Sequence, residues 1–271
     1  MSLSALGLPS QRTVVMGILN VTPDSFADGG RYETTEKAFS RAKEMVAEGV
    51  DIIDVGGEST RPGAERISES TELERVIPVI TEIAKLNAVI SVDTTRSTVA
   101  DAAVKAGARI INDVSGGLAN PEMLGVAAKL NVPYIAMHWR GESKVMQERA
   151  VYKDVVGEVI AELHLRVTAA EAAGITRDNL ILDPGLGFAK ESSHNWEILS
   201  HLKELIDLGF PLLIGASRKR FLGELTGASS ADDREAASIA LTTLLAGQGV
   251  WGVRVHSVKA HRDAIAVAGE F

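Results

Sequence analysis

Cysteine is absent from this chain of 271 residues, which excludes disulfide bonds and thiolate metal sites. Aromatic residues are scarce, at 4% of the chain, and we interpret the three tryptophans as packing residues rather than stacking platforms. Positive charge is also in deficit, because the formal net charge is −8. The chain therefore lacks the general basic surface by which proteins bind DNA or RNA, while a local cationic pocket for a small anion stays compatible with the composition.

Long apolar segments are missing as well. The first twelve residues, MSLSALGLPSQR, lack the basic start and the apolar stretch of a signal peptide. The most apolar window, 236–253, contains polar residues and three glycines, which predicts a buried helix followed by a strand rather than a membrane span. We therefore expect no membrane partner, and the lack of cysteine favours a reducing, cytoplasmic location.

The most regular feature of the chain is an alternation of short apolar runs with amphipathic stretches. Eight runs recur: VVMGILN, DIIDVGGES, AVISVDT, RIINDVSG, PYIAMHW, NLILDPGLG, FPLLIGAS and WGVRVHS. Several stretches between them end at a glycine, the common left-handed helix terminator: Gly49, Gly107, Gly174, Gly209 and Gly249. Apolar strands that alternate with helices predict a parallel sheet.

Eight such units without a linker predict an α/β fold, a (β/α)8 TIM barrel, as a single domain over residues 1–271. A doubly wound open sheet is the alternative, although it more often carries a glycine-rich turn after its first strand.

Nearly every apolar run ends in polar or ionisable residues. These are Asn20, Glu58, Ser59, Thr60, Asp93, Asn112, Asp113, His138, Asp183, Ser217, Arg218, Lys219, Arg254 and His256. In a barrel, the carboxyl ends of the strands form one rim, where active sites lie. A single polar strand end is ordinary turn chemistry, but eight together favour a polar pocket.

This predicted pocket combines acceptors with cations. The acceptors are Asp93, Asn112 and Asp183. A carboxylate pairs well with two adjacent N–H donors, as on a guanidine-like or pyrimidine-like edge. The cations are Lys219, Arg254 and His256, which suit an anionic group such as phosphate. A purely structural network of ion pairs inside the barrel is the alternative.

Two loops rich in glycine and proline follow the first and second runs, at 20–30 and 56–64. Such segments are tightly turned or mobile. Asp24, Asp28 and Arg61 lie in them, where a lid would cover the barrel mouth and exclude water. Ordinary turn chemistry is again the alternative.

Seven segments together resemble a known family. In chain order they are NVTPDSFADGG, GGESTRPGA, SVDT, INDVSGG, DPGLGFAK, GASRKRFLG and VRVHS. They resemble the signature segments of the dihydropteroate synthases, folate-pathway enzymes inhibited by sulfonamides, and the likeness spans residues 14–256. The resemblance implies a homodimeric (β/α)8 barrel that joins p-aminobenzoate to 6-hydroxymethyl-7,8-dihydropterin diphosphate, assisted by Mg²⁺, and releases diphosphate.

The resemblance also implies roles for individual residues. The pterin ring would be held by Asp93, Asn112, Asp183 and Lys219, with Arg254 against its face. The diphosphate would be contacted by Arg254, His256 and Asn20, and Asn20 would also be a Mg²⁺ ligand. The aminobenzoate pocket would be lined by Thr60, Arg61, Pro62, Phe188 and Lys219. The implied catalytic residues are Asp28, in a loop that closes late, with Arg61, Lys219 and Arg254.

The family resemblance implies a dissociative, SN1-like reaction, in which Arg254 and His256 stabilise the charge that grows on the departing diphosphate. Two positions depart from the common pattern. Ser257 stands where many members have an aspartate that could orient the histidine, and Arg220 stands where many have serine. The segment DPGLGFAK has no extra residue of the kind seen in sulfonamide-insensitive members, so we expect sulfonamide sensitivity.

Other functions stay open at this point. A methyltetrahydrofolate-binding methyltransferase barrel shares the pterin-holding acids but should lack NVTPDSFADGG and SRK. Ser257 leaves open a non-catalytic pterin-binding paralogue, and a barrel enzyme for another phosphorylated metabolite is the third alternative. We expect His138 to lie at the pocket edge and the other helical or loop histidines to be solvated, namely His164, His194, His201 and His261.

Overall fold

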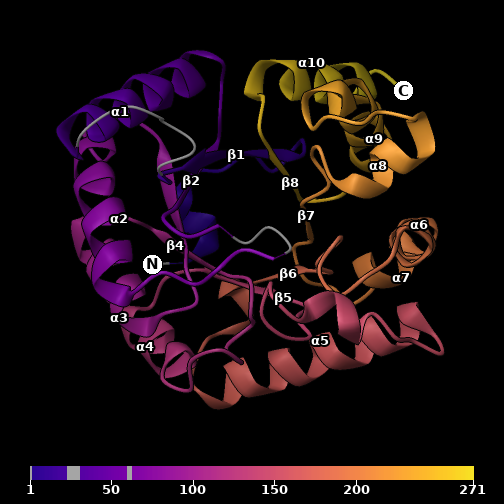
Figure 1. Cartoon of the computed structure of the whole chain (residues 1–271), viewed down its shortest axis with the longest axis horizontal. Coiled ribbons are helices and arrows are strands. Elements are labelled where there is room, and N and C mark those ends of the chain that lie inside the picture. The colour runs from indigo at the N-terminus through magenta and orange to yellow at the C-terminus, as the bar shows by residue number, and fades with distance from the viewer. Residues whose placement is uncertain (1, 23–30, 60–62) are drawn as a thin grey trace.

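The computed structural model describes residues 2–22, 31–59 and 63–271. Within these ranges, short strands alternate with helices along the chain (Figure 1). The strands are β1 (Val14–Asn20), β2 (Ile52–Gly56), β3 (Val89–Asp93), β4 (Ile110–Asp113), β5 (Tyr134–Met137), β6 (Leu180–Asp183), β7 (Leu213–Ile214) and β8 (Gly252–Val255). The α-helices are α1 (Arg31–Ala47), α2 (Glu69–Ile83), α3 (Ser97–Ala106), α4 (Met123–Leu130), α5 (Val155–Ala172), α6 (Ser192–Ser200), α7 (Leu202–Ile206), α8 (Arg220–Thr226), α9 (Glu235–Gly247) and α10 (Val258–Ala268). The 3-10 helices are η1 (Leu3–Leu6), η3 (Met146–Arg149), η4 (Arg177–Asn179) and η5 (Asp232–Arg234).

The strands form one closed parallel ring. Hydrogen-bonded neighbours follow the order β6-β5-β4-β3-β2-β1-β8-β7, and a parallel bridge between Leu182 and Leu212 joins the two ends of this series. The helices surround the ring in chain order (Figure 1). The predicted (β/α)8 barrel is therefore confirmed, and the open doubly wound sheet is wrong, because an open sheet has two unpaired edges.

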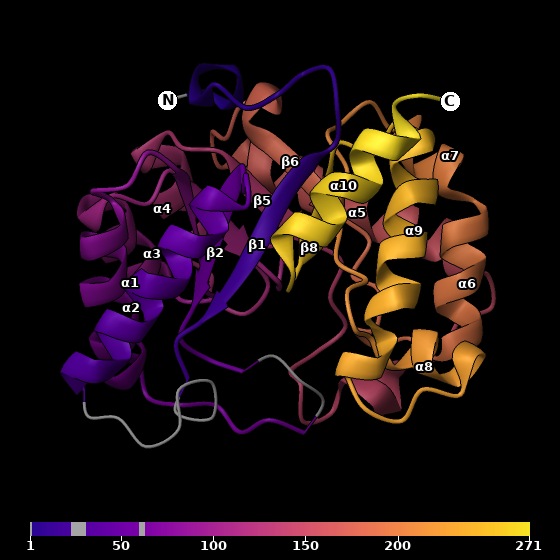
Figure 2. The same cartoon turned by 90° about the horizontal axis from the view of Figure 1, so that it is seen from above.

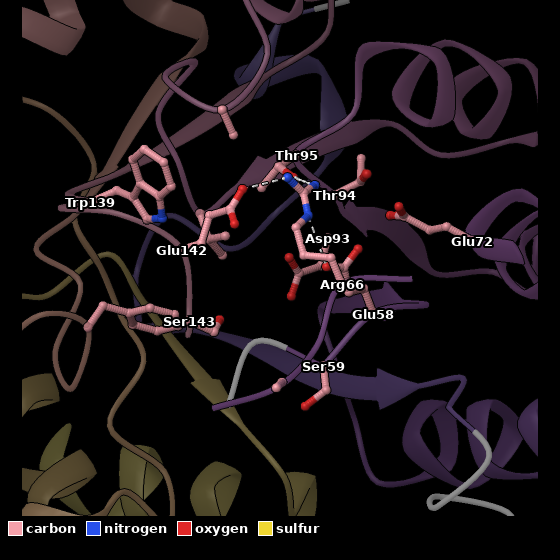
Figure 3. A pocket seen from close by; sticks show the side chains of 14 residues that line it. Glu58, Ser59, Arg66, Glu72, Asp93, Thr94, Thr95, Trp139, Glu142 and Ser143 are labelled. Carbon is pink, nitrogen blue, oxygen red and sulfur yellow. Dashed lines mark hydrogen bonds and ion pairs between the residues drawn. The ribbon is translucent and has the colours of Figure 1, made fainter. Parts of the chain in front are cut away.

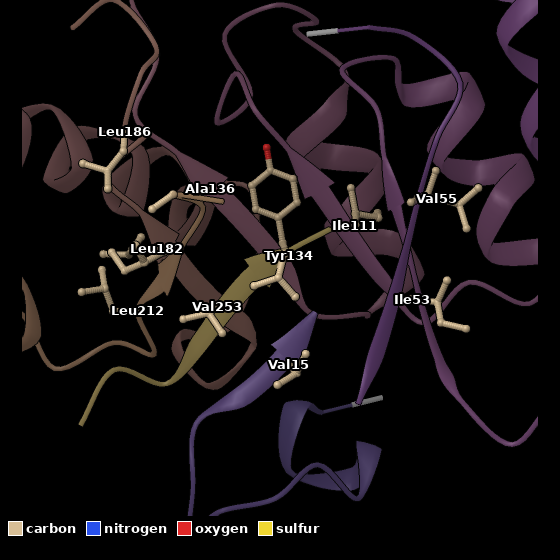
Figure 4. Packing of buried hydrophobic residues seen from close by; sticks show 14 of the residues in the cluster. Val15, Ile53, Val55, Ile111, Tyr134, Ala136, Leu182, Leu186, Leu212 and Val253 are labelled. Carbon is tan, nitrogen blue, oxygen red and sulfur yellow. The ribbon is translucent and has the colours of Figure 1, made fainter. Parts of the chain in front are cut away.

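Alternate residues of each strand face opposite sides of the barrel wall. Outward-facing residues such as Val15, Ile53 and Val253 pack in the large core between strands and helices (Figure 4). Inward-facing residues near the amino ends of the strands form a second apolar cluster, made of Val14, Met16, Ile52, Val89, Ile110, Ile135, Ile181 and Leu213. The interior at this level is a packed core, not a channel.

The amino end of the barrel is covered by η1. Leu6 belongs to the inner apolar cluster, and the backbone N–H of Leu3 donates a hydrogen bond of 3.0 Å to Asn179 Oδ1. Figure 2 shows η1 at one end of the barrel and α8, which follows β7, at the other. A ligand must therefore enter from the carboxyl ends of the strands.

The glycines predicted to end helices all adopt the left-handed backbone region. Their φ angles run from 75° at Gly209 to 127° at Gly107, a region that costs other residues energy. At Gly107, a Cβ would also lie 2.6 Å from Ala84 Cβ, so the chain can reverse there only with glycine. None of the helices in the described ranges has both the length and the apolar character of a bilayer-spanning segment.

Candidate active site

A polar layer lies above the inner apolar cluster, at the carboxyl ends of the strands. The strand register sets Asn20 beside Gly56, Gly56 beside Asp93, and Asp93 beside Asn112. A Cβ on Gly56 would lie 3.6 Å from Asp93 Oδ2 and 3.8 Å from Asn20 Oδ1. Glycine at this position thus leaves room between two polar side chains that face the interior.

Arg254 links this layer across the barrel. Its Nε donates to Asp54 Oδ2 at 2.6 Å, and its Nη2 donates to Asp93 Oδ2 at 2.7 Å. Asn112 Nδ2 also donates to Asp54 Oδ2, at 3.0 Å. The sequence patterns did not predict Asp54, which is fully buried in mid-strand. Its spacing of two from Gly56 is the signal that places it on the inward face.

The next polar group gathers around Gly215, which follows β7. A Cβ on this glycine would lie 3.8 Å from Asp183 Oδ2, 3.8 Å from Lys219 Nζ and 3.9 Å from Arg254 Cβ. These three side chains therefore surround one small space. Asp183 ends β6, Lys219 precedes α8 and Arg254 lies on β8. Only the closed barrel brings these separate segments together.

The acids outnumber the cations in this layer, and burial makes their ionisation costly. Burial raises the pKa of Asp93 to about 7, against the opposing effect of Arg254. Burial also raises the pKa of Asp183, against the opposing effects of Lys219 and of the hydrogen bond from the Gly185 N–H. Burial of its ammonium lowers the pKa of Lys219 to about 8, although Asp183 counteracts this. Perturbed groups of both signs in one cleft are typical of a functional site.

Lys219 also contacts the loop that follows β6. Its Nζ donates to the carbonyl oxygen of Leu186 and lies 4.8 Å from the centroid of the Phe188 ring. Asp183 Oδ1 accepts a 2.7 Å hydrogen bond from the N–H of Gly185 in the same loop. The predicted residues Asp183, Phe188 and Lys219 are thus brought together.

His256 is oriented by Ser217 rather than by the residue that follows it. His256 Nδ1 lies 3.0 Å from Ser217 Oγ. Ser257 instead donates its hydroxyl proton to Glu235 of α9, which also accepts a 2.6 Å hydrogen bond from Arg218 Nε. Glu235 therefore joins the turns after β7 and β8, while the contact that orients the His256 ring comes from a hydroxyl and not from a carboxylate.

A pocket opens between the loops that follow β2, β3, β4, β5 and β6 (Figure 3). Asp93 and Phe188 line it. Arg66 spans the pocket wall, since its Nη1 lies 3.1 Å from Glu142 Oε1 and its Nη2 donates to Thr95 Oγ1 at 2.9 Å. Trp139 lines this pocket too.

Two sequence-based expectations need correction, those for Asp113 and His261. Asp113 does not face the pocket: it points outward, where Tyr134 donates its hydroxyl to it at 2.7 Å. His261 is fully buried and lies 2.8 Å from Thr242 Oγ1, so the expectation that it is solvated was wrong. Arg220 points to solvent and lies 2.9 Å from Glu224. Four predicted site residues lie outside the described residues: Asp28, Thr60, Arg61 and Pro62.

His138 was expected at the pocket edge, but it is buried and forms a pair with Lys190, a residue that the sequence patterns did not single out. Lys190 Nζ lies 2.9 Å from His138 Nδ1, and both side chains are almost fully buried. From sequence alone, a lysine in the loop after a strand is expected to be exposed to solvent, because lysines are rarely buried.

The chain is similar to known proteins over nearly its whole length. Residues 16–256 match the family described as "Pterin binding enzyme". The dihydropteroate synthase of Mycobacterium leprae is 51% identical over 261 residues, which cover 94% of this chain and 92% of that protein. The structure of Xanthomonas albilineans dihydropteroate synthase with 4-aminobenzoic acid has a TM-score of 0.89 at 47% identity, covering 94% of this chain and 92% of that one. The structure of Yersinia pestis dihydropteroate synthase with a sulfonamide drug complex has a TM-score of 0.90 at 40% identity. The match covers 97% of this chain and 95% of that one.

Proposed function

The chain belongs to the pterin-binding enzyme family, and we propose that it is a dihydropteroate synthase. It condenses 6-hydroxymethyl-7,8-dihydropterin diphosphate with p-aminobenzoate and releases 7,8-dihydropteroate and diphosphate. The observation that carries this proposal is the meeting of Asp183, Lys219 and Arg254 around Gly215. An acceptor for ring N–H groups and cations for a diphosphate therefore meet at one point of the barrel mouth, as a ligand that carries both kinds of group requires.

The acids and the amide of the polar layer hold the pterin ring. An ionised carboxylate accepts two parallel N–H bonds from a guanidine-like edge, and these charge-assisted bonds are about twice as strong as neutral ones. Asp183 has one oxygen bound by the Gly185 N–H, which fixes its plane before the ligand arrives. Asp93 and Asn112 stand beside each other on β3 and β4 and contact the polar edge of the ring.

Arg254 and His256 act on the leaving group. Fixed cations stabilise the negative charge that grows on diphosphate as the C–O bond breaks, which is an interaction made most strongly in the transition state. Asp54 and Asp93 hold the Arg254 guanidinium in place through two ion pairs, so little reorganisation is needed during the reaction. The electron-rich pterin delocalises the methylene cation, and the arylamine attacks in the next step.

The donor chemistry at the end of β1 fits Mg²⁺. Mg²⁺ usually takes one or two protein oxygens and completes its octahedron with substrate phosphates and waters. The described residues contain no group of three or more His, Asp or Glu side chains arranged for a metal, which is compatible with such a site. We assign Asn20 as the protein ligand, and the bound ion would neutralise charge on the diphosphate.

The aminobenzoate sits between the loops at the barrel mouth. Phe188 provides an apolar wall, and the ammonium of Lys219 lies against that ring. The assignment of Thr60, Arg61 and Pro62 to this pocket, and of Asp28 and Arg61 to catalysis, rests on the family resemblance alone, because these residues lie outside the described ranges.

A homodimer and a cytoplasmic location complete the proposal. Large apolar side chains are exposed on the last three helices, namely Leu225 on α8, Leu244 on α9 and Val267 on α10. Exposed apolar residues on neighbouring helices support an interface there. The complete lack of cysteine is compatible with a reducing compartment.

The direct test supplies the purified protein with both substrates and Mg²⁺ and measures diphosphate and dihydropteroate. We expect stoichiometric formation of both products, loss of activity in Lys219→Met, and full activity in the exposed control Lys203→Met. Pterin binding without turnover would instead identify a non-catalytic paralogue.

A single-turnover experiment without p-aminobenzoate tests the dissociative step. We expect diphosphate to be released from the pterin substrate alone, because bond breaking precedes attack by the amine. Strict dependence of the release on p-aminobenzoate would contradict this mechanism.

A further inference from the structure

The loop after β6, residues 185–190, has an unusual backbone. Gly185, Gly187 and Ala189 have positive φ angles of 67°, 76° and 47°. The left-handed conformation is uncommon for a residue with a Cβ such as Ala189, so the surroundings must hold it.

Side chains from several elements bind the backbone of this loop. The N–H of Gly187 donates to Asn195 Oδ1 at 2.7 Å, and the hydroxyl of Tyr152 donates to the carbonyl of Ala189 at 2.9 Å. Lys219 binds the carbonyl of Leu186 from the side of the active site. Lys190 binds two further carbonyls of the same loop from the buried side.

The Lys190 ammonium is surrounded by three acceptors. Its Nζ lies 3.1 Å from the carbonyl oxygen of Gly185, 3.1 Å from that of Phe188 and 2.9 Å from His138 Nδ1. An ammonium has three N–H donors, so the number of acceptors matches a protonated lysine. The side chain is only 3% exposed, and water contributes little to its solvation.

His138 is held as an acceptor for this ammonium. Because an ammonium can only donate, His138 Nδ1 accepts from Lys190 through its lone pair, and the ring proton lies on Nε2, 3.0 Å from Glu162 Oε2. Burial, together with the charge of Lys190, lowers the pKa of His138 to about 4. Glu162 is fixed in turn by Arg140, whose Nη2 lies 2.5 Å from its Oε1.

We propose that Lys190 is a positioning residue for the aminobenzoate pocket. Its ammonium binds the carbonyl oxygens of Gly185 and Phe188 on the buried side of the loop and so fixes the shape of the pocket. We call this set of hydrogen bonds the clamp. This inference rests on the proposed function. Lys190 touches no predicted substrate position; it acts through Phe188, whose ring it sets against Lys219 and the pocket. Two lysines thus bind carbonyl oxygens of this loop, Lys219 on the side of the active site and Lys190 on the buried side.

The clamp should weaken as the pH rises. Burial lowers the pKa of Lys190 to about 7; Asp183 and Glu162 oppose this fall, while Lys219 and Arg140 add to it. Neutral His138 accepts in both states. Below that pH the ammonium satisfies all three acceptors. Above it, the amine has only two N–H donors, so one contact with the loop is lost.

The test compares Lys190→Met, which keeps the apolar stem, with the control Lys203→Met, whose lysine is exposed on α7. In Lys190→Met we expect the KM for p-aminobenzoate to rise about tenfold to a hundredfold, while the KM for the pterin diphosphate changes less than about threefold. In the unmodified protein the KM for p-aminobenzoate should rise as the pH passes through about 7, and this rise should be absent from Lys190→Met.

A readout that does not depend on activity is amide hydrogen exchange of residues 184–190. We expect faster exchange in Lys190→Met than in the unmodified protein or in Lys203→Met. If Lys190→Met does not fold, the unmodified protein at pH values on both sides of about 7, corrected for intrinsic exchange, serves the same purpose.

The outcomes separate the two proposals. Faster loop exchange in a chain that never forms dihydropteroate would leave the clamp intact and overturn the proposed function. Unchanged loop exchange, or equal rises in both KM values together with a lower melting temperature, would overturn the clamp and make Lys190 an ordinary core residue.

Discussion

Replacing Arg254 with methionine tests whether one guanidinium holds the polar layer of the barrel together. Its two ion pairs, of 2.6 Å to Asp54 and 2.7 Å to Asp93, involve carboxylates that are only 0% and 7% exposed. Removing the guanidinium leaves two buried carboxylates without their cation, which lowers the free energy of unfolding by about 3–5 kcal/mol. Arg254→Lys keeps the charge but cannot reach both acids at once, so we expect a smaller loss of about 1–3 kcal/mol.

The loss of unfolding free energy caused by Arg254→Met should increase with pH. Because the folded pKa of Asp93 is raised to about 7, the folded chain binds more protons than the unfolded chain between the ordinary aspartate pKa and that value. The stability contributed by this group is therefore lost as the pH rises. Arg254 opposes the shift, so its removal steepens the loss, and the gap between wild type and Arg254→Met should widen from acid to neutral pH.

The assay is urea unfolding followed by circular dichroism at several pH values. The double variant Arg254→Met/Asp93→Asn should regain about 1–3 kcal/mol relative to the sum of the single variants, because the two side chains interact directly. Arg41→Met, which breaks two surface ion pairs, with Glu44 and Glu48, is the control and should cost less than about 1 kcal/mol. Two results would refute the reasoning: a difference in unfolding free energy between wild type and Arg254→Met below about 1 kcal/mol, or a difference that does not change with pH.

Three further results are expected from the same site. Asp183→Asn places an amide donor where the pterin N–H groups need an acceptor, so steady-state kinetics should show kcat/KM for the pterin substrate reduced about a hundredfold or more; a change below about threefold would contradict the assignment. Gly215→Val fills the space bounded by Asp183, Lys219 and Arg254, so calorimetry should detect no pterin binding while the folded circular dichroism spectrum persists, and retained affinity would place the ligand elsewhere. A sulfonamide should raise the KM for p-aminobenzoate without lowering kcat, and inhibition that excess p-aminobenzoate does not relieve would argue against a shared pocket.

The pattern of the sequence was sufficient to predict the barrel and the polar residues at the carboxyl ends of its strands. Apolar runs of strand length alternate with helical stretches, and parallel strands in a barrel deliver their carboxyl ends to one face. For that reason Asp93, Asn112, Asp183 and Arg254 could be assigned to one site before their distances were known. The family segments then supplied the identity of the ligands, which local pattern does not contain.

Other features depended on contacts between distant segments. Asp54 is a single acid within an apolar strand, and its importance appears only where Arg254, 200 residues away, reaches it. Lys190 looks like an ordinary polar residue in sequence, and His138 like a residue of the pocket edge, but the fold buries both against each other. His261 was misjudged because helical position alone does not tell which face a neighbouring helix covers.

The amino-acid sequence by itself determined the secondary elements, their order and the polar residues at the strand ends, since these follow from local periodicity and turn chemistry. The tertiary structure alone decided which charges pair, which loop carbonyls meet an ammonium and which side chains lose their water. The physical reason is that ion pairing and desolvation depend on distances of a few ångströms between segments that the sequence holds far apart.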